Sequence, residues 1–235
     1  MQRFYYPTLN NLEIISIKDQ NEIFHQLTKV LRSKIWDEVI FFDWNNYIDH
    51  IYTIDSIEKN NIILKLKEKI TKNSENNINL NLYQSLPNKQ EKIEFIIQKW
   101  VEVWYNYFYF FKSDRSQNLK ITENKIERFK KIIIEASEQS WRNIIPQLFF
   151  IEKLSLENIK WENLYFHTDK NKAKKLKELD IKSWKINIFV WPEWWFSEKE
   201  SKIFEKNNLT KINLWDYILR TETTWIVVGF YLMQI

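Results

Sequence analysis

Two short segments carry residue types that could hold a ligand at close range and act on it. Residues 191–200 read W-P-E-W-W-F-S-E-K-E and follow a short apolar run. Ser197 and Glu200 have the spacing of a helix capping box, which predicts a turn between a strand and a helix N-terminus. Such a turn presents backbone N–H and C=O groups to a ligand, although a simple tight turn would give the same pattern.

The second segment is 214–224, with the sequence L-W-D-Y-I-L-R-T-E-T-T. Arg220 directly precedes an apolar stretch that reads as a helix, with Thr221 as the expected N-cap. An arginine beside a helix N-terminus could stabilise an oxyanion or a phosphate. An ordinary ion pair with Glu222 or another carboxylate is the alternative interpretation.

A third segment, 135–146, reads E-A-S-E-Q-S-W-R-N-I-I-P and places Glu138, Gln139 and Arg142 at the end of a predicted helix. Taken alone, it is most simply a solvated helix terminus. It precedes both of the other segments in the chain.

Several classes of chemistry are excluded or unsupported. The chain has no cysteine, which excludes disulfides, a thiol nucleophile and cysteine-based zinc sites. His25, His50 and His167 are scattered without metal-ligand spacing, so we expect no metal. The apolar run 225–233 is far shorter than the roughly 20 residues that span a bilayer, and the N-terminus lacks a signal-peptide layout, so we expect a cytoplasmic protein. A net charge of +4 permits an RNA partner without identifying one.

The elements that must position these segments follow two patterns. Up to about residue 70 the chain reads as mostly β, with strands expected at 38–42, 47–55 and 63–70 and a short helix at 22–31. After the polar stretch 71–77, strands and helices alternate, which predicts a mostly parallel sheet covered by helices. The expected strands are 79–85, 107–112, 164–167 and 186–190, and the expected helices are 89–103, 122–139, 171–179, 198–207 and 222–233.

Glycine is almost absent, while tryptophan is abundant. The 235 residues include one glycine and twelve tryptophans, whereas average usage predicts about 16 glycines. Trp104 and Trp141 follow helical patterns at the position where helices end on glycine, and Trp44 follows Asp43 where an Asp-Gly turn is expected. We therefore hypothesise that most or all of these tryptophans are UGA codons that the source organism reads as glycine. A genuinely tryptophan-rich protein is the alternative.

Taken together, these segments resemble the RsmE-type branch of the SPOUT RNA methyltransferases over essentially the whole chain. The family signatures K-x-x-E-L-G, E-Q-S-x-R-x-x-x-P, G-P-E-G-G-F-S-x-x-E and L-G-x-x-I-L-R-x-E-T-A are similar, in this order, to residues 99–104, 138–146, 191–200 and 214–224. Residues 25–32, H-Q-L-T-K-V-L-R, resemble the family's N-terminal motif. Departures are Val103 for leucine, Thr224 for alanine, and tryptophan at the family glycines other than Gly229.

The resemblance implies an α/β fold class, with an N-terminal PUA-like β-barrel at 1–72 that binds RNA and a C-terminal trefoil-knot SPOUT methyltransferase domain at 73–235. It implies a homodimer that uses S-adenosyl-L-methionine (SAM) to methylate N3 of a uridine in 16S rRNA of the small ribosomal subunit. Three loops are then expected to bind SAM, with the residues His167, Trp191, Pro192, Glu193, Trp194, Trp195, Phe196, Leu214, Trp215 and Leu219. Residues expected to bind RNA are Arg3, His25, Arg32, Lys34 and Arg142.

Methylation at N3 requires loss of a weakly acidic proton, which leaves negative charge on the flanking carbonyl oxygens of uracil. Arg220 is the candidate for stabilising that charge. The sequence alone does not identify the general base, although Glu222 and Glu193 both lie in suitable segments for a catalytic role. Three other functions stay open. They are a SPOUT methyltransferase with another RNA target, a non-catalytic RNA-binding relative if Trp191, Trp194 and Trp195 are genuine, and an aromatic-rich carbohydrate-binding module.

Overall fold

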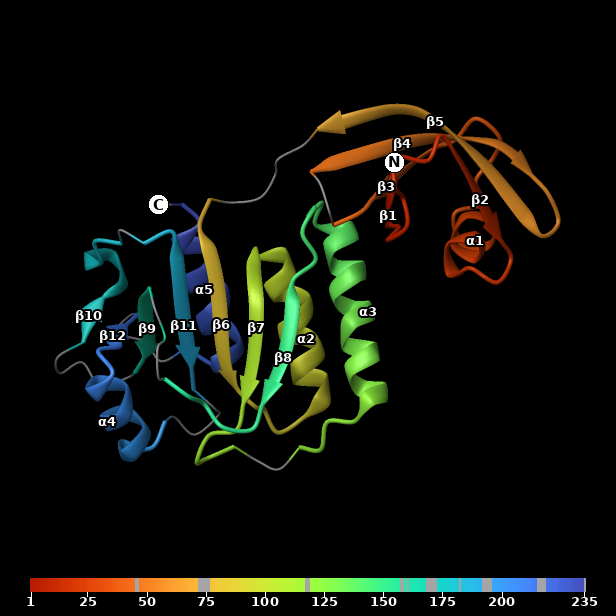
Figure 1. The fold of residues 1–235 in the computed structure, drawn as a ribbon. Helices are drawn as coiled ribbons and strands as arrows, with labels where there is room; N and C mark the ends of the chain where they lie inside the picture. The colour runs from red at the N-terminus through yellow and green to blue at the C-terminus, as the bar shows by residue number, and fades with distance from the viewer. Residues whose placement is uncertain are drawn as a thin grey trace. The chain divides into compact units, whose positions relative to one another are not determined.

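The computed structural model describes residues 1–44, 47–71, 77–116, 119–156, 159, 161–167, 173–181, 183–191, 196–214 and 219–234. The chain forms two compact units, which we call the N-terminal and the C-terminal unit (Figure 1). The N-terminal unit comprises Met1–Glu75 together with Ser137–Ile144. The C-terminal unit comprises Asn76–Ala136 and Ile145–Ile235.

The N-terminal unit is built on a mixed five-stranded sheet with the order β1-β3-β4-β5-β2. β1 pairs with β3 in parallel, and the remaining neighbours are antiparallel. Its elements are β1 (Gln2–Tyr5), β2 (Ile14–Lys18), α1 (Glu22–His25), a π-helical turn (Gln26–Val30), β3 (Glu38–Phe42), β4 (Ile48–Ile57) and β5 (Asn61–Thr71). The strands predicted from alternating apolar residues are confirmed, whereas β1 and β2 were not predicted.

The C-terminal unit contains a seven-stranded sheet with the order β10-β12-β9-β11-β6-β7-β8. All of its strand pairs are parallel, which confirms the α/β fold class expected from the alternation of strands and helices. Its strands are β6 (Asn79–Ser85), β7 (Tyr105–Phe111), β8 (Gln147–Ile151), β9 (Glu162–Phe166), β10 (Lys174–Lys175), β11 (Lys185–Val190) and β12 (Thr210–Asn213). Its helices are α2 (Gln90–Glu102), α3 (Glu123–Gln139, whose last turn belongs to the N-terminal unit), a 3₁₀ turn (Leu176–Glu178), α4 (Glu198–Lys206) and α5 (Thr221–Leu232).

The predicted helix at 171–179 is wrong over its described part. Lys174–Lys175 forms the edge strand β10, which pairs with Ile212 and Asn213 of β12, and only the 3₁₀ turn follows it. The lysine- and leucine-rich sequence favours a helix, but pairing with β12 overrides that weak local preference. β8 and β12 were also not predicted from the sequence.

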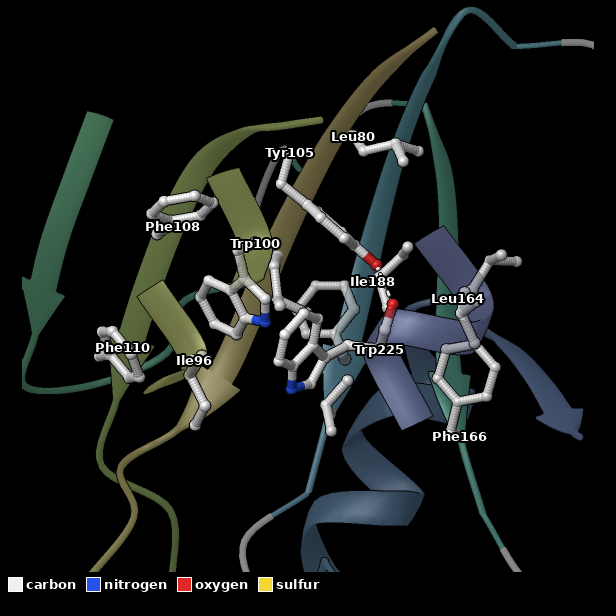
Figure 2. Packing of buried hydrophobic residues seen from close by; sticks show 14 of the residues in the cluster. Leu80, Ile96, Trp100, Tyr105, Phe108, Phe110, Leu164, Phe166, Ile188 and Trp225 are labelled. Atoms are coloured by element: carbon white, nitrogen blue, oxygen red, sulfur yellow. Dashed lines mark hydrogen bonds between the residues drawn. The ribbon is translucent and has the colours of Figure 1, made fainter. Parts of the chain in front are cut away.

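An aromatic cluster fills the space between the sheet and the helices α2 and α5 (Figure 2). Trp100 of α2 and Trp225 of α5 meet edge to face with ring centroids 5.2 Å apart, and Trp100 also stacks on Phe110 of β7. The Tyr105 hydroxyl donates to the Trp225 carbonyl at 2.9 Å. This hydrogen bond and the buried rings fix the start of α5 against the middle of the sheet.

Among the described residues, no helix is long and apolar enough to cross a membrane. Within the same part of the chain, no group of three or more histidine, aspartate or glutamate side chains is arranged to hold a metal ion.

Candidate functional site

Three of the predicted loops begin at the same edge of the parallel sheet. β12, β9 and β11 are neighbours, and Leu214, His167 and Trp191 directly follow their C-terminal ends. The backbone N–H of His167 donates to the carbonyl of Ile212 in β12 at 3.1 Å, which ties two of these strand ends together. Ligands of open parallel sheets bind beyond the carboxyl ends of the strands, so this edge is the expected position of a ligand site.

The carbonyl of Trp191 connects three elements at this edge. It accepts a hydrogen bond from Gln84 Nε2 of β6 at 3.1 Å, and the Thr221 hydroxyl at the start of α5 lies 3.5 Å away. The Trp191 side chain itself is buried. The two segments that the sequence singled out, 191–200 and 214–224, therefore meet at Trp191 and Thr221.

The loop after Trp191 re-enters the described structure at Phe196, which is buried and packs edge to face on Phe204 of α4 at 4.7 Å. The predicted capping box is confirmed. Glu200 N donates to Ser197 Oγ at 3.1 Å, and Ser197 N donates to the Glu200 carboxylate at 2.8 Å. Pro192, Glu193, Trp194, Trp195 and Trp215, which were predicted to bind the cofactor, lie outside the described residues.

Arg220, not Thr221, is the N-cap residue of α5. The prediction of Thr221 is wrong by one position because the Arg220 carbonyl already accepts bonds from the N–H groups of Thr223 and Thr224, at 2.9 and 3.0 Å. No side chain caps the helix at this residue. The Arg220 side chain is exposed, and no carboxylate among the described residues forms an ion pair with it. Leu219, before it, is half-buried.

A cavity of about 320 Å³ adjoins this arrangement within the C-terminal unit. Its lining includes Gln84, Ser85, Pro87, Phe95, Thr221 and Glu222. Gln84 and Ser85 were not singled out from the sequence. The sequence did contain a signal for them, because both residues end the predicted strand 79–85, and parallel sheets bind ligands beyond the carboxyl ends of their strands.

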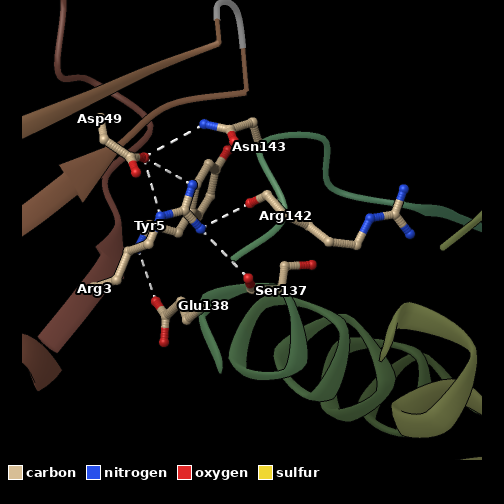
Figure 3. A network of polar contacts seen from close by, with 7 residues as sticks. All are labelled: Arg3, Tyr5, Asp49, Ser137, Glu138, Arg142 and Asn143. Atoms are coloured by element: carbon tan, nitrogen blue, oxygen red, sulfur yellow. Dashed lines mark hydrogen bonds and ion pairs between the residues drawn. The ribbon is translucent and has the colours of Figure 1, made fainter. Parts of the chain in front are cut away.

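Residues 137–144 of the third motif belong to the N-terminal unit, where they lie around the buried side chain of Arg3 (Figure 3). The Arg3 guanidinium pairs with Asp49 at 3.0 Å and donates to the carbonyl of Arg142 at 2.7 Å. The carboxylate of Glu138 accepts a bond from Tyr5 N at 2.8 Å. Removing one partner of such a buried charge pair costs about 3–5 kcal/mol, so this network holds the end of α3 on β1 and β4.

The residues predicted to bind RNA therefore fall into two groups. Arg3 and Arg142 are buried, and Arg3 already makes the contacts of the network in Figure 3. His25, Arg32 and Lys34 are exposed on the N-terminal unit. His25, Arg32 and Lys34 are therefore exposed enough to contact RNA, and RNA binding by these residues stays a prediction.

Comparisons with known proteins agree with this geometry. Residues 74–233 match the family described as RNA methyltransferase domain. The chain is 34% identical to the ribosomal RNA small subunit methyltransferase E of Buchnera aphidicola over 222 residues, which cover 90% of this chain and 84% of that protein. It is 30% identical to the ribosomal RNA small subunit methyltransferase E 2 of Borreliella burgdorferi, with 90% of this chain and 88% of that protein covered.

A crystal structure of the ribosomal RNA small subunit methyltransferase E of Neisseria gonorrhoeae, bound to S-adenosyl methionine, superimposes with a TM-score of 0.84 at 26% sequence identity. The match covers 100% of this chain and 95% of that chain. A methyltransferase from Legionella pneumophila has the same fold, with a TM-score of 0.82 at 21% identity. The chain thus belongs to the RNA methyltransferase family, in the branch of the ribosomal RNA small subunit methyltransferases E.

Proposed function

We propose that this protein transfers a methyl group from SAM to N3 of a uridine in 16S rRNA of the small ribosomal subunit, in the cytoplasm. The observation that carries the proposal is the meeting of segments 191–200 and 214–224 at the carbonyl of Trp191. This contact places an exposed arginine at the strand-end edge of a sheet whose fold is shared with a SAM-bound relative.

The residues at this edge fit a SAM site in their arrangement. Three neighbouring strands end together, and the segments that follow them supply the backbone groups of His167, Trp191 and Leu214 at one edge. Leu219 is half-buried and borders these loops with apolar surface, while the buried ring of Phe196 anchors the end of its loop on Phe204. We assign the remaining contacts to Pro192, Glu193, Trp194, Trp195 and Trp215, which belong to these loops in the sequence. When bound, SAM supplies an electrophilic methyl group.

Arg220 and Glu222 have complementary roles in the proposed reaction. The N3 proton of uracil must leave, and Glu222, at the wall of the 320 Å³ cavity, is the group that we assign to receive it. The negative charge that then develops on the carbonyl oxygens O2 and O4 is stabilised by the Arg220 guanidinium. No described carboxylate neutralises Arg220 in advance, so its charge is available to the substrate.

We further propose that the protein acts as a homodimer through α2 and α5, which pack side by side. Phe230 of α5 is 61% exposed and Phe95 of α2 is 43% exposed. Helix α5 carries apolar residues on all sides, and a helix of that kind needs cover on more than one face. A second copy of the chain would supply this cover.

The test of the proposed function is methylation of small ribosomal subunits from cells that lack the modification, followed by identification of the product nucleoside by mass spectrometry. We expect 3-methyluridine at a single site. A methyl group on another atom or base would overturn the substrate proposal. A protein that binds no SAM in calorimetric titration would overturn the assignment of an enzymatic function.

A further inference from the structure

A second hollow lies beside the cavity at Glu222, on the same edge of the sheet. This groove has a volume of about 830 Å³ and runs past the C-terminal ends of β7 and β8. Its lining includes Leu86, whereas the neighbouring residues Ser85 and Pro87 line the cavity. The two hollows therefore flank one short segment, residues 85–87.

The groove is basic. Lys112, Lys120 and Lys153 line it, and Glu152 is the carboxylate among its lining residues. All three lysines are exposed, and none of them forms an ion pair with a described carboxylate. Three ammonium groups around one hollow create a local positive potential that attracts an extended anion.

The walls between these lysines are apolar. Leu86, Ile121 and Phe150 line the groove and are partly buried. The ring of Phe150 stacks on Phe110 at 5.4 Å, which fixes its orientation. A ligand that suits this surface needs phosphates for the lysines and flat or apolar groups for the walls, and single-stranded RNA has both. An acidic peptide offers charge with less apolar surface, so it fits less well.

The groove is held in place by the structure around it. Leu86 N donates to the carbonyl of Phe111 at 2.9 Å, and Lys125 Nζ donates to the carbonyl of Lys120 at 3.0 Å. The hydroxyls of Ser85 and Ser113, at the ends of β6 and β7, lie 2.6 Å apart. The Leu86–Phe111 and Ser85–Ser113 contacts join the ends of β6 and β7, and the Lys125–Lys120 contact holds the segment before α3. A ligand therefore meets a preformed surface.

We propose that this groove binds the phosphate backbone of the RNA strand on one side of the nucleotide that reacts, with Lys112, Lys120 and Lys153 as phosphate contacts. The proposal rests on the proposed function, because it takes the substrate to be RNA. It assigns to the C-terminal unit an RNA contact of its own, in addition to the exposed residues of the N-terminal unit.

The test compares two triple variants that remove the same charge. The first is Lys112→Gln, Lys120→Gln and Lys153→Gln. The control is Lys130→Gln, Lys177→Gln and Lys206→Gln, three exposed lysines of the same unit that do not line the groove. Affinity for a 20-nucleotide single-stranded RNA is measured between 50 and 300 mM salt, and SAM affinity is measured on the same samples.

Each single-strand phosphate contact contributes about 0.7 to the slope of log K against log salt. The groove variant should therefore lose about 2 from that slope and bind RNA on the order of a hundredfold more weakly at 0.1 M salt. Its SAM affinity should match that of the wild type, which shows an intact fold, and the control should bind RNA like the wild type.

Three results would overturn the proposal. The first is that the groove variant binds RNA as tightly as the wild type does. The second is that both triple variants lose the same RNA affinity. The third is that poly-glutamate of the same charge displaces the labelled RNA from the wild type as well as unlabelled RNA does. These readouts do not depend on which base is methylated. A wild type that binds RNA through the groove but modifies no uridine would refute the proposed function and leave the groove assignment standing.

Discussion

At the scale of single residues, the tryptophans stand out because of their backbone conformations. Trp36, Trp104, Trp141 and Trp161 have φ angles of 76°, 62°, 61° and 77°, in the left-handed region that favours glycine. Trp104 follows the end of α2 and Trp141 follows the end of α3, as expected for residues that replace a helix-ending glycine. We propose that these positions are glycine in the native protein, encoded by UGA. Twelve UGG codons in the gene would end this proposal.

The left-handed tryptophans give a stability prediction. Trp36→Gly and Trp161→Gly should each raise the free energy of unfolding by roughly 1 kcal/mol, because relief of about 1–3 kcal/mol of strain exceeds the entropic cost of glycine. Trp36 is 76% exposed and Trp161 is 49% exposed, so replacing either side chain loses little buried surface. Urea denaturation measures the change. Trp184→Gly is the control, since Trp184 is 61% exposed without a left-handed φ, and it should be neutral or destabilising.

A second residue-scale prediction concerns Arg220. Arg220→Ala should lower the rate of methyl transfer by roughly 100- to 1,000-fold, the usual effect of removing a group that stabilises an oxyanion, with little change in SAM affinity. Single-turnover methylation and calorimetric titration measure the two effects. Arg128→Ala is the control, because Arg128 pairs with Glu94 on the helices α2 and α3. An Arg220→Ala variant with wild-type rates would remove the residue from the mechanism.

At the scale of secondary-structure elements, the single glycine lies where α5 approaches the start of β7 closely. Gly229 is in the middle of α5, and a Cβ atom placed there would lie 2.6 Å from Tyr105 Cε2 and 2.8 Å from Val103 Cγ1. Tyr105 is fully buried and cannot move aside freely. The contact between α5 and the start of β7 therefore requires the absence of a side chain at residue 229.

Gly229→Ala should destabilise the protein by about 1–3 kcal/mol, as expected for an added methyl group in a packed core. Helix propensity alone predicts the opposite change in stability, because alanine is more stable than glycine at an exposed position within a helix. Thr223→Ala, at an exposed position of α5, is the matched control and should change stability little. Thermal unfolding measures both variants, and a stabilised Gly229→Ala protein would contradict this close packing of α5 on Tyr105 and Val103.

The elements also show how far the sequence could predict this structure. Long segments with a clear apolar period, such as α2, α3 and β6, were predicted to within a few residues, because burial of one face determines both pattern and structure. The short strand β12 pairs with β9 and with the edge strand β10, and no local pattern encodes such pairing. That the loops at 191–195 and 214–220 lie together was expected from the family resemblance, whereas the contact between Trp191 and Thr221 was not. Gln84 and Ser85 end a strand that was predicted, but their place beside β11 became visible only from the sheet order.

At the scale of the whole molecule, our proposals assign RNA contacts to both units. His25, Arg32 and Lys34 are exposed on the N-terminal unit, and the basic groove belongs to the C-terminal unit. Arg32→Glu should weaken binding of small ribosomal subunits at low salt, with a smaller loss at high salt because the contact is ionic. Lys59→Glu, at an exposed position of the same unit, is the control. Equal binding by Arg32→Glu and wild type in filter-binding assays would exclude this surface.

The proposed dimer gives a prediction at the same scale. Phe230→Glu should convert the protein from dimer to monomer, since a carboxylate on an apolar interface leaves a buried charge without a partner. Sedimentation equilibrium measures the mass. Glu222 and Thr221 begin the same helix, so we also expect the monomer to be a poorer enzyme. A dimeric Phe230→Glu protein would show that another surface joins the subunits.

The inclusion of residues 137–144 in the N-terminal unit also affects how the protein is made. Once the five strands of this unit have left the ribosome, the Arg3 guanidinium still lacks the carbonyls of Ser137 and Arg142. Residues 76–136, which belong to the other unit, must be synthesised before these acceptors emerge. The nascent N-terminal unit therefore cannot complete its fold until residues 137–144 have been synthesised. The first 75 residues expressed alone should be prone to proteolysis and to binding by chaperones.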